Sequence, residues 1–206
     1  MILRIAYLFI LSYLIGGIPT GYLIVKAIKK EDIRNLGSGN IGFTNVVRTT
    51  GILPGIVVLI IDIAKAFFTT HYIPEVLPFE SILQPVIGIA VIAGNIFNPF
   101  LGFKGGKGVA TGLGVAIAIS PLSVIFSISA FALVVLTTKY VSLGSLTAAT
   151  IYMLCNVIFY IRETKDIYTL IFSAVLTVAV WMRHISNIQR LIHGEENKIG
   201  KRKNHA

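Results

Sequence analysis

Charged residues are scarce in this chain. They make up 13% of its 206 residues, against about 25% in ordinary soluble domains. By contrast, 55% of the residues are hydrophobic and the mean hydropathy is +0.82. A water-soluble fold of this size needs more polar surface than this composition can supply. The composition therefore excludes a soluble globular protein and predicts an all-α integral membrane protein.

Cysteine is almost absent. Cys155 is the single cysteine and lies in an apolar run, so the chain can form no internal disulfide and no zinc site from several thiolates. We interpret Cys155 as a packing residue and expect neither a metal nor a cofactor. A convincing small-residue cleavage site is also missing after the apolar start MILRIAYLFILSYLIGG. This stretch therefore predicts a retained first helix and not a removed signal peptide.

Long apolar runs fill most of the remaining sequence. A helix that crosses a bilayer needs about 20 apolar residues, and we identify seven candidate segments, the fourth of which is short. They cover residues 3–27, 52–71, 81–100, 107–120, 121–138, 143–161 and 167–184. The step from Ser120 to Pro121 predicts a tight turn between the fourth and fifth segments. We expect one seven-transmembrane-helix domain over residues 1–206.

Lysine and arginine are distributed unevenly over the two faces that seven crossings create. One face has only Arg4, Arg162 and Lys165, and Lys65 lies inside a span. The other face holds Lys26, Lys29, Lys30, Arg34, Arg48, Lys104, Lys107, Lys139, Arg183, Arg190, Lys198, Lys201, Arg202 and Lys203. By the positive-inside rule the larger set is cytoplasmic, which places the N-terminus outside and the C-terminus in the cytoplasm.

The excess of positive charge also bears on partners. The net charge of +9 would suggest nucleic acid in a soluble protein, but here it sets the topology and attracts anions, so we expect no nucleic-acid partner. Residues 193–206 form a predicted basic cytoplasmic tail. Within this tail, Lys201, Arg202 and Lys203 are predicted to contact the membrane surface.

The first predicted cytoplasmic loop, NLGSGNIGFTNVVRTTG at residues 35–51, is rich in glycine, hydroxyl and amide groups. Glycine adopts positive φ without steric cost, so such a loop can turn its backbone N–H groups toward an anion. Its candidate ligands are Gly37, Ser38, Gly39, Asn40, Thr44, Asn45 and Arg48, of which Arg48 has a planar fork suited to phosphate. A flexible solvated linker would have a similar composition, so both interpretations stay open for this segment alone.

The second predicted cytoplasmic loop, GFKGGKG at residues 102–108, leads directly into the fourth apolar segment. Backbone donors and the helix dipole favour an anion at a helix start. The candidate phosphate ligands are Lys104, Gly105, Gly106, Lys107 and Gly108. The loop is not a Walker motif, because Leu101 replaces its first glycine and Gly108 its Ser or Thr. A basic interfacial anchor with glycines for close helix packing is the alternative.

Two further groups of polar residues stand out. His184 and Asn187 are three residues apart and share a face if the helix continues, although an interfacial histidine can equally be a capping residue. Ser142 adds a hydroxyl on the cytoplasmic side. Within the second span, an unpaired Asp62 or Lys65 would cost roughly 2.5 to 3.5 kcal/mol on insertion scales. We therefore predict a structural ion pair there, with a packing role favoured over direct catalysis.

Together, these loops resemble the bacterial acyl-phosphate:glycerol-3-phosphate acyltransferase family, often called PlsY, over nearly the whole chain. The resemblance rests on GSGNIGFTN with Arg48, on NPFLGFKGGKGVATGLG, on KYVSLGS, on the Asp62–Lys65 pair, and on His184, Asn187 and the GEE-containing tail. The sequence departs from the family pattern at Ile41, Phe43 and Asn95, where proline, alanine and histidine are usual. We interpret Asn95 as keeping only a hydrogen-bonding role.

The resemblance implies a multi-pass enzyme of the bacterial inner membrane, with an active site facing the cytoplasm. Its reaction moves a fatty acyl group from acyl phosphate to the sn-1 hydroxyl of glycerol 3-phosphate and yields lysophosphatidate and phosphate. This reaction is the first step of phospholipid synthesis, so membrane lipid is a further partner. The HxxxxD pair of acyltransferases that use acyl-CoA follows none of the four histidines.

Each candidate residue has an expected role in this reaction. Lys104 would stabilise the carbonyl oxyanion or the leaving phosphate. Acyl phosphate would be held by Ser38, Asn40 and the backbone of residues 105–108. Glycerol 3-phosphate would be held by Arg48, Ser142, His184 and Asn187. The hydroxyl proton would pass to His184 or to a substrate phosphate oxygen.

Two other classes of protein are alternatives. An organophosphate or anion transporter could use the same loops as a vestibule, but the two halves of the sequence show no obvious repeat. A non-catalytic membrane scaffold would have no reason to gather such loops on one face.

Overall fold

The computed structural model describes residues 2–74 and 80–199, and over these residues its regular elements are all helical. The chain divides into two compact units, Met1–Ile119 and Ser120–Ala206. Residues 75–79 of the predicted outside connection, and Lys201, Arg202 and Lys203 of the predicted membrane-contacting tail, lie outside the described residues.

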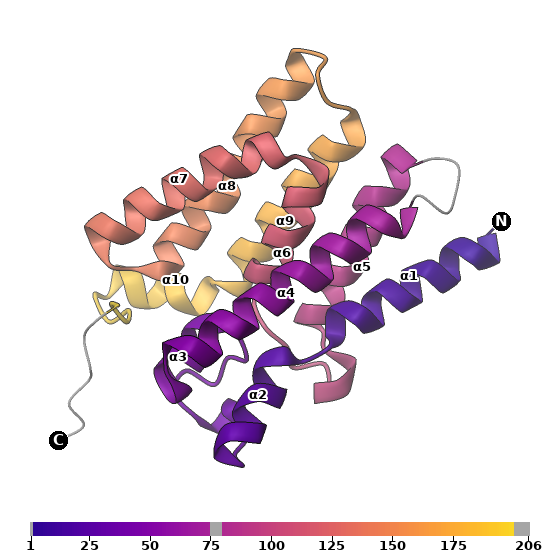
Figure 1. Ribbon diagram of the computed structural model, residues 1–206. Coiled ribbons are helices and arrows are strands. Elements are labelled where there is room, and N and C mark those ends of the chain that lie inside the picture. The colour runs from indigo at the N-terminus through magenta and orange to yellow at the C-terminus, as the bar shows by residue number, and fades with distance from the viewer. Residues whose placement is uncertain (1, 75–79, 200–206) are drawn as a thin grey trace. The chain divides into compact units, whose positions relative to one another are not determined.

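The first unit contains the helices that carry the two glycine-rich loops (Figure 1). Its elements are α1 (Ile2–Gly17), α2 (Thr20–Lys29), the 3₁₀ turn η1 (Ile33–Asn35), α3 (Phe43–Thr50), α4 (Ile52–Tyr72), α5 (Glu80–Ile96), the 3₁₀ turn η3 (Pro99–Leu101) and α6 (Val109–Ile119). The first loop lies between η1 and α3, and the second lies between η3 and α6.

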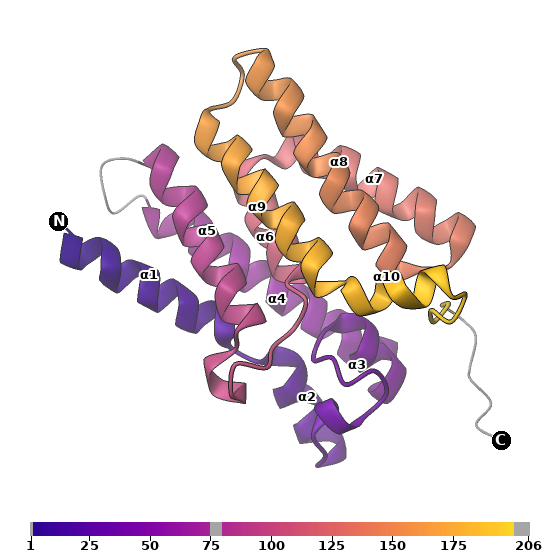
Figure 2. The same ribbon diagram turned by 180° about the vertical axis from the view of Figure 1, so that it is seen from behind.

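The second unit consists of α7 (Pro121–Thr138), α8 (Val141–Ile161), α9 (Ile167–Arg183) and α10 (Ile185–Ile192). Helices α7 and α8 form a hairpin, and α9 packs against α8. A bend of 58° separates α9 from α10, and the change of direction can be followed in Figure 2. His184 is the residue at this bend.

Five helical segments of the described residues are long and apolar enough to cross a membrane, and the bent pair α9–α10 is a sixth if it counts as one span. The fourth predicted segment forms α6, which has 11 residues. At 1.5 Å per residue it is about 16 Å long, roughly half the thickness of a bilayer core. The count of seven crossings therefore stays a prediction.

The first predicted span is interrupted, because α1 ends at Gly17 and α2 begins at Thr20. Proline has no N–H group and its ring excludes the preceding helical turn, so Pro19 accounts for the break. A broken helix leaves backbone carbonyls without their usual partners. In a membrane such groups must be satisfied from within the protein.

The Ile18 carbonyl at this break accepts from the Thr20 N–H at 3.0 Å and from a side chain of α4. The Lys65 Nζ donates to the Ile18 carbonyl at 2.7 Å and lies 2.7 Å from the Asp62 carboxylate, while the Thr20 hydroxyl donates to the same carboxylate at 2.9 Å. Both charged side chains are only 8% exposed. The ion pair thus lies buried, as its positions in an apolar run suggest, and it ties α4 to the junction of α1 and α2.

Helices α1 and α5 approach each other closely through glycines. A Cβ atom at Gly16 would lie 2.0 Å from the carbonyl oxygen of Val91, and one at Gly94 would lie 1.9 Å from that of Tyr13. Neither position has room for a side chain. This contact places the end of α5, which leads through η3 into the second loop, beside the break in the first span.

We expect Lys65→Met to lower the free energy of unfolding by about 3 to 5 kcal/mol, because Asp62 would remain buried without its cation. Thermal unfolding in detergent measures the effect. The double variant Asp62→Asn with Lys65→Met should lose less stability than Lys65→Met alone, since it leaves no unpaired charge. Equal losses in the two variants would contradict a pairing role.

Candidate functional site

The first loop folds around the side chain of Asn45, at the start of α3. Its Oδ1 accepts from the Ser38 N–H at 2.8 Å, and its Nδ2 donates to the carbonyls of Leu36 and Asn40 at 2.9 and 2.8 Å. Asn45 is only 2% exposed. It was expected to bind substrate, but its amide is used to hold the loop backbone, so we interpret it as a supporting residue.

Glycine is required where the first loop passes over Asn45. Gly37 has a φ of 57°, which L side chains rarely adopt, and a Cβ atom there would lie 2.3 Å from the Asn45 Oδ1. The Asn40 Oδ1 in turn accepts from the Gly42 N–H at 2.8 Å. The loop is therefore an ordered turn, which argues against the flexible-linker interpretation.

Few side chains of this loop are exposed to solvent. Ser38 and Arg48 are exposed, whereas Asn40 and Thr44 are half-buried. The Arg48 Nη1 lies 3.5 Å from the Asn45 Oδ1, at the limit of a hydrogen bond. Arg48 thus projects its charge from the last turn of α3, close to the Asn45 side chain that also holds the Ser38 N–H.

The second loop folds back onto the end of α5. The Gly105 N–H donates to the Ile96 carbonyl at 3.1 Å, and the Gly106 N–H donates to the Asn95 carbonyl at 3.0 Å. These two N–H groups were expected to bind phosphate, but they are used inside the protein. Lys104, Lys107, Gly108 and the first turn of α6 are the remaining parts of the predicted anion site.

Asn95 and the loop glycines are in close contact. A Cβ atom at Gly105 would lie 1.9 Å from the Asn95 carbonyl oxygen, and one at Gly106 would lie 2.9 Å from the Asn95 Oδ1. Asn95 itself is 7% exposed. The contribution of Asn95 is therefore to hold the loop backbone. Lys104 projects from the same loop and is exposed.

The two loops of the first unit meet at Ile41, which is 4% exposed. A Cβ atom at Gly21 of α2 would lie 1.9 Å from the Ile41 carbonyl oxygen, and one at Gly106 would lie 3.6 Å from the Ile41 side chain. Ile41 also belongs to a buried apolar cluster with Val25, Ile33, Val46, Val58 and Leu101. This cluster joins α2, η1, α3, α4 and η3, so one core supports both loops.

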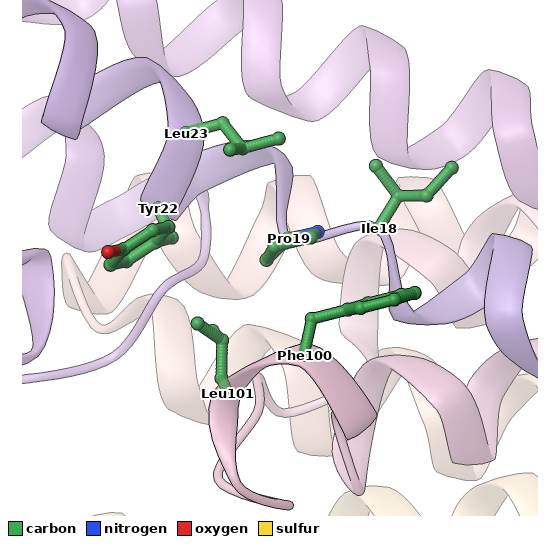
Figure 3. A pocket seen from close by; sticks show the side chains of 6 residues that line it. All are labelled: Ile18, Pro19, Tyr22, Leu23, Phe100 and Leu101. Atoms are coloured by element: carbon green, nitrogen blue, oxygen red, sulfur yellow. The ribbon is translucent and has the colours of Figure 1, made fainter.

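A cavity of about 380 Å³ lies next to this core, on the side of α2 (Figure 3). It is lined by Ile18, Pro19, Tyr22, Leu23, Phe100 and Leu101. The Tyr22 hydroxyl is the one polar side-chain group among them. The cavity has the chemistry of an alkyl- or lipid-facing surface, and it is unsuited to a phosphate.

In the second unit, His184 caps the bend between α9 and α10. It is 3% exposed, and its Nδ1 lies 2.7 Å from the Val180 carbonyl oxygen. A carbonyl can only accept, so Nδ1 carries the hydrogen. In the neutral ring, Nε2 then has the lone pair. This arrangement fits both the capping interpretation and a role as a base.

Asn187 and Arg190 meet at Glu196. The Asn187 Nδ2 and the Arg190 Nε each donate to the Glu196 carboxylate at 2.7 Å. Burial by itself raises the pKa of Glu196, but the hydrogen bonds from Asn187 and Arg190 and the charge of Arg190 outweigh it, so the net pKa is lowered. The candidate Asn187 is thus bound to a carboxylate for which no role was predicted, whereas the buried Ser142 hydroxyl has no hydrogen-bond partner among the described residues.

The start of the predicted tail is held against the second unit. Besides the bonds to Glu196, the Lys198 Nζ lies 5.0 Å from the centre of the Tyr140 ring, and the Ile199 N–H donates to the Lys139 carbonyl at 3.0 Å. The two acidic residues Glu195 and Glu196 within an otherwise basic tail were the sequence signal for this docking. Residues 195–199 therefore belong to the fold.

Comparison with known proteins identifies the family. The model of the glycerol-3-phosphate acyltransferase family matches residues 6–194. The chain belongs to the glycerol-3-phosphate acyltransferase family. Among its relatives, glycerol-3-phosphate acyltransferase 2 of Bacillus anthracis is 43% identical over 191 residues, covering 92% of this chain and 96% of the relative. The enzyme of Prochlorococcus marinus (strain MIT 9215) is 42% identical over 188 residues, covering 91% and 94%.

Solved structures of this family have the same fold. A crystal structure of PlsY, an integral membrane glycerol 3-phosphate acyltransferase, in its glycerol 3-phosphate form aligns with a TM-score of 0.87 at 36% identity, covering 95% of this chain and 96% of that one. The lysophosphatidic acid form aligns with a TM-score of 0.84 at 35% identity, covering 95% of each chain. The predicted family and the all-helical integral membrane fold are thereby confirmed.

The pKa of Glu196 predicts how acid affects this glycerol-3-phosphate acyltransferase. Because the folded-state pKa is lowered, the unfolded chain takes up the proton first as the pH falls. The stabilisation is therefore complete above the ordinary glutamate pKa of about 4.3 and is lost as the pH falls through the lower folded-state value.

Thermal midpoints from pH 7 down to about 3.5 measure this effect. The wild type should be more stable than Glu196→Gln at neutral pH, and the difference should shrink on acidification below the ordinary value. Glu195→Gln, at an exposed neighbour, is the control and should match the wild type. A difference between wild type and Glu196→Gln that does not vary with pH would contradict the assignment.

Proposed function

We propose that this chain transfers a fatty acyl group from acyl phosphate to the sn-1 hydroxyl of glycerol 3-phosphate, producing lysophosphatidate and phosphate. Acylation of glycerol 3-phosphate follows from membership of the family, whose model covers residues 6–194. Acyl phosphate as the donor is our inference from the two loops with anion-binding character. The alternative of an organophosphate transporter finds no support in the comparisons.

We further propose that the enzyme spans the bacterial inner membrane with its N-terminus outside and its active site facing the cytoplasm. The support is the uneven distribution of cations, since 14 Lys and Arg residues lie on the predicted cytoplasmic face, whereas the other face has only Arg4, Arg162 and Lys165. On this topology, the short α6 is the fourth of seven membrane segments.

The reaction needs no covalent acyl-enzyme, because acyl phosphate is already an activated mixed anhydride. The sn-1 hydroxyl oxygen attacks the acyl carbonyl carbon, and the new ester bond forms as the bond from that carbon to the phosphate oxygen breaks. Alignment of two bound substrates can contribute roughly 7 to 11 kcal/mol to lowering the barrier. Donors aimed at the developing oxyanion add to this effect.

The chain's own residues take the following roles in this proposal. Lys104, exposed on the second loop, stabilises the oxyanion or the departing phosphate. Ser38 and Asn40, with Lys107 and Gly108, bind the acyl phosphate. Arg48 binds the phosphate of glycerol 3-phosphate through its planar fork. In the second unit, Ser142, His184 and Asn187 are assigned to glycerol 3-phosphate from the family resemblance.

The hydroxyl proton has two possible acceptors. One is the Nε2 atom of His184, which has the lone pair of the neutral ring because Nδ1 donates to the Val180 carbonyl; the other is a phosphate oxygen of the substrate. A His184→Ala protein distinguishes them by its kinetics. Loss of about 10² to 10⁴ in kcat identifies His184 as the base, whereas an unchanged kcat with a higher KM for glycerol 3-phosphate identifies the substrate.

The function is tested with purified protein supplied with acyl phosphate and labelled glycerol 3-phosphate, without added nucleotide or metal. We expect labelled lysophosphatidate. Label that crosses the membrane of proteoliposomes without forming an ester would instead indicate a transporter.

In the same assay, Lys104→Ala should lower kcat by about 10² to 10³, the effect of removing one oxyanion donor. The thermal midpoint should stay close to that of the wild type, because Lys104 is exposed. Lys29→Ala, which removes an exposed cation from α2, is the matched control and should keep full activity. Near wild-type turnover by Lys104→Ala would refute the assigned role.

A further inference from the structure

The guanidinium of Arg34 connects the base of the first loop to the start of the second. Its Nε lies 3.0 Å from both carboxylate oxygens of Asp32, and its Nη2 lies 2.6 Å from the Asp32 Oδ2. Its Nη1 donates to the carbonyl of Leu101, 67 residues away, at 3.3 Å. One side chain thus contacts both η1 and the end of η3.

Two further contacts orient this guanidinium. It lies over the ring of Tyr22 at 5.8 Å, within the range of a cation–π contact. The backbone N–H of Arg34 also donates to Asp32, at 2.9 Å. Asp32 stays ionised to a lower pH than an ordinary aspartate, because the hydrogen bond from the Arg34 side chain holds its pKa below the usual value. Arg34 is therefore oriented by α2 on one side and by η1 on the other.

The Leu101 carbonyl is the acceptor that closes the turn carrying Lys104. It accepts hydrogen bonds from the Lys104 N–H at 3.4 Å and from the Arg34 Nη1 at 3.3 Å. Between Leu101 and Lys104, the residues Gly102 and Phe103 both have positive φ, at 63° and 61°. A phenylalanine rarely adopts this conformation, which persists only where the surroundings enforce it. The Phe103 N–H, which donates to the buried Asn98 carbonyl at 2.8 Å, provides another such restraint.

We propose that Arg34 is a positioning residue for Lys104. By holding the Leu101 carbonyl, Arg34 keeps the 101–104 turn in its left-handed form and aligns the second loop with the first. This inference rests on the proposed function, because it gives Lys104 its role in acyl transfer. Arg34 acts through that turn and does not itself contact the substrate.

Arginine is suited to this task and lysine is not. Its planar fork bonds the Asp32 carboxylate on one edge and the Leu101 carbonyl with the remaining nitrogen, whereas a lysine ammonium has a single charged atom. The Arg34 side chain is 36% exposed and that of Asp32 is 22% exposed. Ion pairs with such exposure contribute little to stability. A substitution should therefore change the kinetics while the protein still folds.

The first test is steady-state kinetics. Arg34→Ala should lower kcat by about 10- to 100-fold, the effect of displacing a catalytic group by roughly 1 Å, with an unchanged thermal midpoint. Arg34→Lys should retain little of the lost rate. Lys29→Ala, which removes a cation of the same α2–η1 region, should behave as the wild type. Wild-type kcat in Arg34→Ala would overturn the proposal.

Two double variants test whether Arg34 acts on Lys104 through the 101–104 turn. In a Lys104→Ala background, Arg34→Ala should cause no further loss, because the group that it positions is already absent. Phe103→Gly should restore part of the rate of Arg34→Ala, since glycine adopts positive φ without help. Losses that multiply in the first double variant, or no recovery in the second, would refute an effect through the turn.

A readout independent of turnover keeps this inference distinct from the proposed function. Hydrogen exchange at the amides of residues 103–105 should become faster in Arg34→Ala than in the wild type and in Lys29→Ala. Wild-type protein that makes no lysophosphatidate would refute the proposed function alone, because the exchange measurement still reports the turn. Unchanged exchange in an active enzyme would refute the role of Arg34 alone.

Discussion

The buried Asp62–Lys65 ion pair at the break of the first span is the interaction on which the first unit depends. Pro19 breaks this span, and the Ile18 carbonyl there accepts from the Thr20 N–H at 3.0 Å and from the Lys65 Nζ at 2.7 Å. Lys65 is neutralised by Asp62, which also accepts from the Thr20 hydroxyl, and a buried charge without its partner would cost several kcal/mol. Because of the break, the first turn of α2 packs Gly21 against the Ile41 carbonyl and places the Tyr22 ring under the Arg34 guanidinium. Both loops are thus built on a helix start that the α4 ion pair stabilises.

The site is organised in two layers. Buried amides and carbonyls hold the loop backbones from within: Asn45 supports the first loop, and Asn95 and Asn98 support the second. Ser38, Arg48 and Lys104 project outward from the supported turns. This division explains why glycine is needed at Gly37 and Gly105, where a Cβ atom would collide with the supporting residue. It also separates residues that shape the loops from those free to carry chemistry.

The sequence predicted the helices well where apolar runs are long and end at recognisable residues. Segment 121–138 corresponds to α7 residue for residue, and segment 52–71 to α4 within one residue. The pairing of Asp62 with Lys65 also followed from the sequence, because two charges in an apolar span have few other partners. The break at Pro19, the supporting position of Asn45 and the use of the Gly105 and Gly106 amides were not foreseen.

Composition, hydropathy, charge distribution and loop motifs by themselves determined that this is a helical membrane protein of the acyltransferase family. These properties are local or additive, so they can be read residue by residue. Tertiary structure alone decided that Arg34 reaches Leu101 and that Glu196 accepts from both Asn187 and Arg190. A hydrogen bond depends on an approach within about 3 Å and on direction. Between residues far apart in the chain, only the packing of the helices sets that geometry.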